Sequence, residues 1–204
     1  ANQINLLVTT PGVAVQFWDG NQLIANGSVD GGSGIWDTST PNWTDVNGKT
    51  NQVRSNNFAV FQGAAGTVTV NSAQTITGMQ FATDGYSSVN GAAGSLSLVN
   101  GELGNATVRV DPNATATVGT ALNGSATLGK YDRGTLVLNA ANGYTGGTAL
   151  NGGKIVVGNN AALGTGALTA ADSTVLDSNV AVALGNNVVL NGALNVTGSN
   201  ALTL

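Results

Sequence analysis

The chain contains no cysteine and no histidine, and each absence removes a class of function. Without cysteine there are no disulfides and no thiolate ligands for a metal, and without histidine every histidine-dependent catalytic triad is excluded. Charged residues make up only 8% of the 204 residues, with six basic residues and a formal net charge of -4. Because nucleic-acid binding needs several phosphate contacts from lysine or arginine, we expect no nucleic-acid partner.

Long hydrophobic runs are also missing. No apolar stretch approaches the roughly 18–20 residues that a membrane-spanning helix requires. No basic segment followed by an apolar one opens the chain, so we expect any signal peptide to have been removed. The sequence stops at Ala201 to Leu204, within an alternating run, and we therefore expect it to be a C-terminally truncated piece of a longer protein.

What the chain does contain is glycine, at 30 positions, and a hydrophobic fraction of 42%. The apolar residues occur in short alternating pairs, such as Leu136 with Leu138 and Ile155 with Val157. Alternation of this kind predicts short strands, because successive side chains of a strand point to opposite faces. Eight Asn-Gly dipeptides lie between the pairs, and both residues tolerate the positive φ of a tight corner.

Two β architectures fit short strands joined by Asn-Gly corners: antiparallel hairpins and a parallel solenoid. The spacing of the expected strands favours the solenoid. Related strand centres lie about 20–28 residues apart, whereas the strands of an antiparallel meander would recur roughly every 8–12 residues. The expected pairs are Val68 with Leu96, Val108 with Leu136, Leu136 with Ile155, and Leu168 with Val189. The predicted fold is an all-β parallel β-helix of about eight or nine coils, if every residue belongs to it.

The first 90 residues differ from the rest. They hold eight of the ten aromatic residues: Phe17, Trp18, Trp36, Trp43, Phe58, Phe61, Phe81 and Tyr86. A solenoid needs an end that covers its core and its open strand edge. We therefore predict an aromatic-rich N-terminal cap with irregular first coils over residues 1–90, followed by regular coils over residues 91–204.

One region carries a more specific pattern. Residues 128–138 read Leu-Gly-Lys-Tyr-Asp-Arg-Gly-Thr-Leu-Val-Leu, residues 142–148 read Asn-Gly-Tyr-Thr-Gly-Gly-Thr, and residues 151–157 read Asn-Gly-Gly-Lys-Ile-Val-Val. Together they resemble the autotransporter-associated β-strand repeat of bacterial type V passengers, over about residues 128–170. The motif positions are Lys130, Gly134, Leu136, Leu138, Tyr144, Gly146, Gly147, Thr148 and Gly153.

The upstream segments Gly34–Asp37, Asn42–Thr44, Ala59–Phe61 and Phe81–Tyr86 resemble the region that often precedes such repeats. The chain departs from the family in holding one full copy of the repeat and no translocator barrel. The resemblance implies a right-handed parallel β-helix on, or released from, a Gram-negative outer membrane. It also implies a repeat that promotes secretion, and a translocator barrel as partner in the full-length protein.

Candidate chemistry is sparse. The ten acidic residues show no Asp-x-Asp or Glu-x-x-Asp pair, so we expect turn roles and no catalytic residues. Residues 31–37 resemble a calcium-binding nonapeptide, but the Asp falls one position late in a single copy, so we expect no metal and no cofactor. Trp18, Trp36 and Trp43 could form a carbohydrate-binding platform; the alternative, which we favour, is that they plug the end of the helix.

These observations predict a non-enzymatic passenger fragment: a β-helical, secretion-promoting stalk with an adhesin surface. Its expected partners are a host-cell or neighbouring-cell surface, with a glycan as one candidate, and other copies of the chain through exposed strand edges. The alternative from another class is a β-helical protein that binds or degrades polysaccharide.

Overall fold

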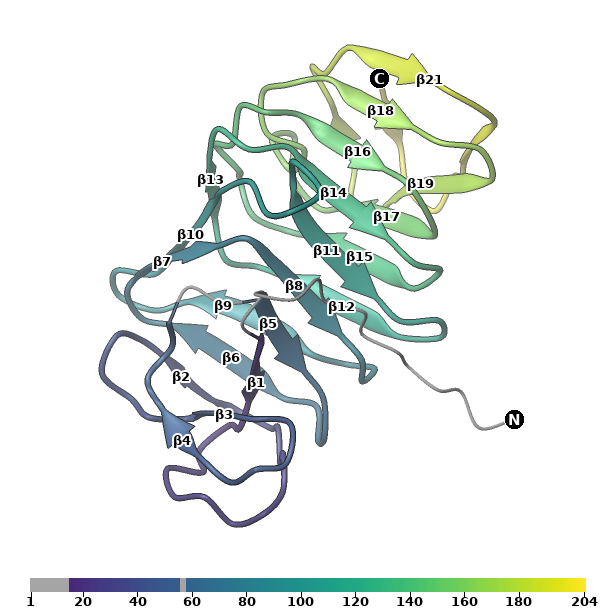
Figure 1. Ribbon diagram of the computed structural model, residues 1–204. Helices are drawn as coiled ribbons and strands as arrows, with labels where there is room; N and C mark the ends of the chain where they lie inside the picture. Colours follow the sequence, from purple (N-terminus) through teal and green to yellow (C-terminus); the bar gives the residue numbers. More distant parts are fainter. Residues whose placement is uncertain (1–14, 56–57) are drawn as a thin grey trace.

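The computed structural model describes residues 15–55 and 58–204, and over these residues the chain forms a parallel β-solenoid (Figure 1). The chain winds repeatedly past three faces, and strands of successive coils pair in parallel on each face. In the described part of the chain no helix could cross a membrane. The prediction of an all-β solenoid is confirmed.

Two of the faces are stacks of eight parallel strands, which make about seven turns. The first sheet contains β1 (Val15–Trp18), β5 (Phe58–Phe61), β8 (Gly78–Phe81), β11 (Ala106–Val110), β14 (Leu128–Tyr131), β16 (Thr148–Leu150), β18 (Leu168–Ala170) and β21 (Val188–Leu190). The second contains β2 (Gly34–Trp36), β6 (Thr67–Val70), β9 (Ser87–Asn90), β12 (Thr115–Val118), β15 (Thr135–Leu138), β17 (Lys154–Val157), β19 (Thr174–Ser178) and β22 (Leu194–Val196).

The third face has fewer strands than the other two, but backbone hydrogen bonds still connect its successive coils. It holds β7 (Ala73–Ile76), β10 (Ser95–Leu98) and β13 (Leu122–Gly124), and later the pair β20 (Val182–Ala183) and β23 (Leu202–Thr203). Between them, the amide of Gly143 donates to the carbonyl of Leu122 and that of Thr165 to the carbonyl of Tyr144. At the N-terminal end, β3 (Trp43–Thr44) and β4 (Asn51–Gln52) add to β1 in antiparallel order.

The coil length is close to twenty residues in the regular part, because Lys130 pairs with Leu150 and Leu150 with Ala170. Coils of other lengths explain why about seven turns form rather than eight or nine: Phe17 pairs with Val60, and Ser88 pairs with Val118. The extra residues of these two coils leave the stack as loops and as the β3–β4 hairpin.

The expected strand pairings are partly wrong. Leu136 does pair with Ile155, but Leu168 pairs with Val188, one residue from the expected Val189. Val68 pairs with Ser88 rather than Leu96, because Leu96 lies on the third face.

The last expected pair is also wrong: Val108 pairs with Lys130 rather than Leu136, which lies on the second sheet. The alternating pattern identified inward residues correctly, since Leu136, Leu138, Ile155 and Val157 are fully buried in one continuous core.

Candidate functional site

The N-terminal end of the core is an aromatic cluster. The side chains of Trp18, Trp36 and Trp43 are buried, with exposed fractions of 0%, 1% and 0%. Trp43 lies between the other two, with ring centroids 5.2 Å from Trp18 and 5.0 Å from Trp36 in edge-to-face geometry, an arrangement that aromatic quadrupoles favour. Phe61 and Phe81, register partners on adjacent coils, stack at 4.9 Å and continue the cluster into the helix.

Arg54 covers this cluster. Its guanidinium carbon lies 4.9 Å from the Trp36 ring centroid and 4.8 Å from that of Trp43, so one buried cation contacts two indole faces. Such contacts are attractive because the ring face is the negative end of the quadrupole. Sequence reasoning did not identify Arg54, and no motif around it would have pointed to this position.

The three tryptophans therefore expose no indole face on which a sugar could stack. The Trp18 indole nitrogen donates to the carbonyl of Gly32 at 2.8 Å. The Tyr86 hydroxyl donates to the carbonyl of Gln62 at 2.7 Å and accepts from the Gly32 amide at 3.2 Å. These bonds tie the loop before β2 to the first coils, so the cluster closes the end of the core.

Lys130 occupies an inward position of β14, between Val108 and Leu150 in register, and is 0% exposed. Its ammonium group reaches the corner after the strand and donates to the carbonyl oxygens of Tyr131 at 2.6 Å, Asp132 at 2.9 Å and Gly152 at 3.2 Å. The lysine of the repeat thus holds together the corners of two successive coils. Burial lowers the pKa of Lys130 to about 8, with the Asp132 charge opposing the shift.

This lowered pKa predicts a pH-dependent stability. Between pH 8 and 10 the unfolded chain keeps a proton on residue 130 that the folded chain has lost, so stability rises with pH. Relative to Lys130→Met, we expect the wild-type free energy of unfolding to rise by about 2 kcal/mol from about pH 7.5 to 9.5. Denaturant titrations at several pH values measure it, and no imidazole or thiol titrates in this range because the chain has neither. A pH-independent difference would show that Lys130 keeps an ordinary pKa.

The Asn-Gly-Tyr part of the repeat forms the third face of its coil. The Asn142 side chain accepts from the Leu122 amide at 2.9 Å and donates to the Ala162 carbonyl at 2.7 Å, so it links three coils. Tyr144 is 0% exposed, and its hydroxyl bonds Thr148 at 2.6 Å. Burial raises the pKa of Tyr144. Its ring lies against Gly164 of the next coil, where a Cβ would come within 3.0 Å of two ring atoms.

The glycines of the repeat lie where neighbouring coils come close. A Cβ on Gly134 would lie 2.3 Å from the carbonyl oxygen of Asp111, and one on Gly146 would lie 2.4 Å from the carbonyl carbon of Ala126. Gly147 and Gly153 also have φ of +83° and +69°, which side chains disfavour. The repeat is thus a set of contacts between coils, and its motif residues fix coil stacking.

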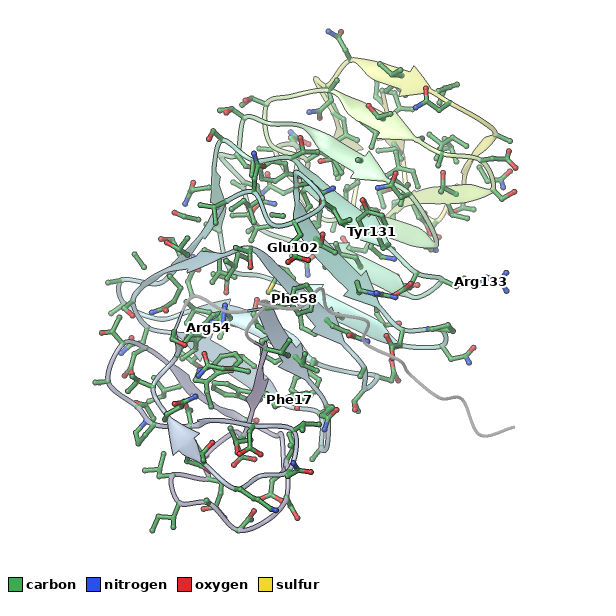
Figure 2. All side chains as sticks on the ribbon, in the orientation of Figure 1. Phe17, Arg54, Phe58, Glu102, Tyr131 and Arg133 are labelled. Atoms are coloured by element: carbon green, nitrogen blue, oxygen red, sulfur yellow. The ribbon has the colours of Figure 1, made fainter. Side chains whose placement is uncertain are left out.

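The outer face of the first sheet carries two partly exposed aromatic residues that sequence reasoning did not single out as a site, Phe58 and Tyr131. Phe58 lies beside Gly78, whose Cβ position is 2.5 Å from the Phe58 Cε2 atom. The Tyr131 Cε2 atom is 2.9 Å from the Cβ position of Gly129. Each ring therefore leans over a glycine, and Figure 2 labels both side chains on this face. For Tyr131 the signal in the sequence was Gly-x-Tyr, two residues on one face of a strand; Phe58 leans over a glycine of the neighbouring strand, for which the local sequence gives no signal.

The acidic residues serve mainly as corner caps and ion-pair partners. Asp84 and Asp172 each accept an amide hydrogen bond from the next coil, from Thr115 and Ala193. Asp177 accepts from Lys154 at 2.7 Å, and this hydrogen bond is the main reason that the pKa of Asp177 is well below its usual range. Among residues 15–55 and 58–204, no three His, Cys, Asp or Glu side chains gather as a metal site would require.

The chain is similar to a curated protein, the Adhesin BmaC autotransporter of Brucella suis biovar 1 (strain 1330). The two are 36% identical over 178 residues, which is 80% of this chain and 5% of that adhesin. No protein-family model matches the chain, and no solved structure matches it. The chain thus corresponds to a small part of a much longer relative.

Proposed function

This chain is a β-helical region of an autotransporter passenger, exposed at the cell surface or secreted, and on that premise we propose that it acts as a non-enzymatic stalk with an adhesive surface. The observation that carries the proposal is the 36% identity, over most of the chain, to a protein named an adhesin. Because the chain spans 5% of that relative, the adhesive role of this particular segment is the part to be tested.

The continuous stack supports the stalk role. Seven steps at the spacing of paired strands correspond to an axial length of about 34 Å, filled by one core. Each coil contacts mainly its neighbours, so coils can form one after another. Sequential folding outside the cell would favour export over return, which is the secretion-promoting role that we assign to the repeat around Lys130 and Tyr144.

The composition of the surface supports contact with another cell. Exposed positions are mostly Asn, Thr, Ser and Gly, and charged residues are few. A surface of this kind makes hydrogen bonds that depend little on ionic strength, in contrast to binding through charged patches. We therefore expect adhesion that persists as salt is raised.

An adhesion assay tests this function. Beads coated with the fragment should attach to cultured epithelial cells or to bacterial cells in greater number than beads coated with albumin, and about equally at low and high salt. The control is the same fragment after chemical denaturation, which should not attach. Equal attachment of fragment and albumin beads to every surface would leave this segment without an adhesive role.

A further inference from the structure

We propose that the outer face of the first sheet, from β5 to β14, binds an uncharged glycan on the rings of Phe58 and Tyr131. This inference rests on the proposed adhesive function and names the chemistry of the surface partner. It places the site away from the buried tryptophans, on two side chains that are partly exposed.

The Tyr131 ring is held in place from both ends. Its edge leans over Gly129, where no side chain separates the ring from the backbone, and its hydroxyl accepts a hydrogen bond from the Asn105 side-chain nitrogen at 3.0 Å. The ring is therefore held at its edge and at its hydroxyl, while the side chain remains partly exposed to solvent. A ring fixed in this way loses little conformational freedom when a ligand stacks on it.

Phe58 also lies over a glycine, here one of the adjacent strand β8. It leans over Gly78, and Gly78, Thr107 and Gly129 follow one another in a single register column. The two glycines are two strand steps apart, so the rings above them are about 10 Å apart. That separation is comparable to the disaccharide repeat of an extended beta-linked glycan.

Polar groups flank the aromatic pair. Arg109 is the register neighbour of Tyr131, and its guanidinium contacts both carboxylate oxygens of Asp132, at 2.8 and 3.1 Å. The two side chains are 34% and 25% exposed, so ligand hydroxyls can reach them. Because the charge of Arg109 is balanced by Asp132, this face favours an uncharged ligand over a sulfated one.

The side-chain oxygen of Gln80, on the same face, also lacks a hydrogen-bond donor in the described part of the chain. Gln80 follows Arg109 in the same column, is 5% exposed, and donates to Asp111 at 2.9 Å. Its Oε1 atom is buried and has no hydrogen-bond partner in the described part of the chain. A buried acceptor without a donor is costly, and a hydroxyl entering beside Arg109 would supply one.

Together these groups match the chemistry of a pyranose. Its ring C–H bonds carry partial positive charge, which meets the negative face of an aromatic ring. Its hydroxyl groups both donate and accept, which suits a guanidinium, a carboxylate and an amide at the ring edge.

The test is a titration of the folded fragment with chitotetraose and cellotetraose, followed by calorimetry and by amide NMR shifts. We expect at least one of them to bind and to shift the amides of Arg109 and Gly129, and a heparin tetrasaccharide to bind more weakly. Tyr131→Ala should weaken binding about tenfold, while Tyr131→Phe keeps most of it. The matched control is Val137→Ala on the outer face of the second sheet, which should bind as wild type does.

Absence of binding to both uncharged glycans would overturn the inference, and so would binding that Tyr131→Ala leaves unchanged or preferential binding of heparin. The bead assay separates this failure from failure of the proposed function. Adhesion of the beads without any glycan binding would support the proposed adhesive function and refute the glycan site. Glycan binding through Tyr131 without adhesion of any bead would refute the adhesive function and support the glycan site.

Discussion

Gly146→Ala should destabilise the central coils and lower the free energy of unfolding by about 3 kcal/mol or more. The new methyl group would lie 2.4 Å from the carbonyl carbon of Ala126 and 2.5 Å from the backbone atoms Ser125 O and Thr127 N. These are backbone atoms of the preceding coil, so no rotamer change relieves the overlap. The coils must separate, which breaks the hydrogen bonds between β14 and β16. Chemical denaturation followed by circular dichroism measures the loss.

The matched control is Gly185→Ala. A Cβ at Gly185 meets no atom within 4 Å, and its φ lies outside the positive range. We expect a change of at most about 0.5–1 kcal/mol, and toward higher stability, because alanine restricts the unfolded chain. Equal effects of the two substitutions would mean that the close approach of coils at Gly146 does not limit stability.

Some of the fold could be predicted from local pattern because the interior of a solenoid repeats. Alternating pairs such as Ile155 and Val157 identified the inward positions, and the Asn-Gly corners identified where strands end. The passenger assignment from the Gly-Gly-Thr repeat is confirmed by the similarity to an autotransporter adhesin. These features depend on residues close in sequence, which a single chain displays directly.

Register could not be predicted across the long coils. Each coil contributes strands to three faces. Two strands 28 residues apart can therefore be neighbours on one face, joined by a long coil, or can lie on different faces. Leu96 follows the second case, on the third face. The pairings of Ser88 with Val118 and of Gly78 with Thr107 reveal that this coil contains an extra loop. Nothing in the local sequence distinguishes such a loop from a coil.

The candidate sites depended on which face each residue joins. Lys130 follows the strand alternation into the core, against the ordinary preference of lysine for solvent, because three carbonyl groups from the corners of two successive coils accept its hydrogen bonds. Arg54 follows the β3–β4 hairpin and is buried against the indoles of Trp36 and Trp43, a contact that no local sequence pattern indicates. Tyr131 looks like any strand tyrosine until Gly129 and Asn105 are seen to orient it.

Trp43→Ala should cost about 3–5 kcal/mol, the range for removing a buried aromatic residue. The Trp43 ring contacts the rings of Trp18, Trp36 and Phe61, at centroid distances of 5.2, 5.0 and 5.8 Å. Its removal leaves a cavity among them and takes from Arg54 one of its two indole faces. The exposed Val46 nearby, 62% accessible, provides the control: Val46→Ala should stay within about 0.5 kcal/mol.

The position of the coils that Trp43→Ala destabilises is as informative as the size of the loss in stability. Because each coil of a solenoid is stabilised mainly by its neighbours, loss of Trp43 should first open the N-terminal coils, while β15, β17 and β19 stay protected. Hydrogen exchange of the Trp43→Ala protein should therefore accelerate around β1 to β6 and remain slow in the later coils. Uniform acceleration would instead mean that the aromatic cluster stabilises the whole stack, and that the fragment unfolds as one cooperative unit.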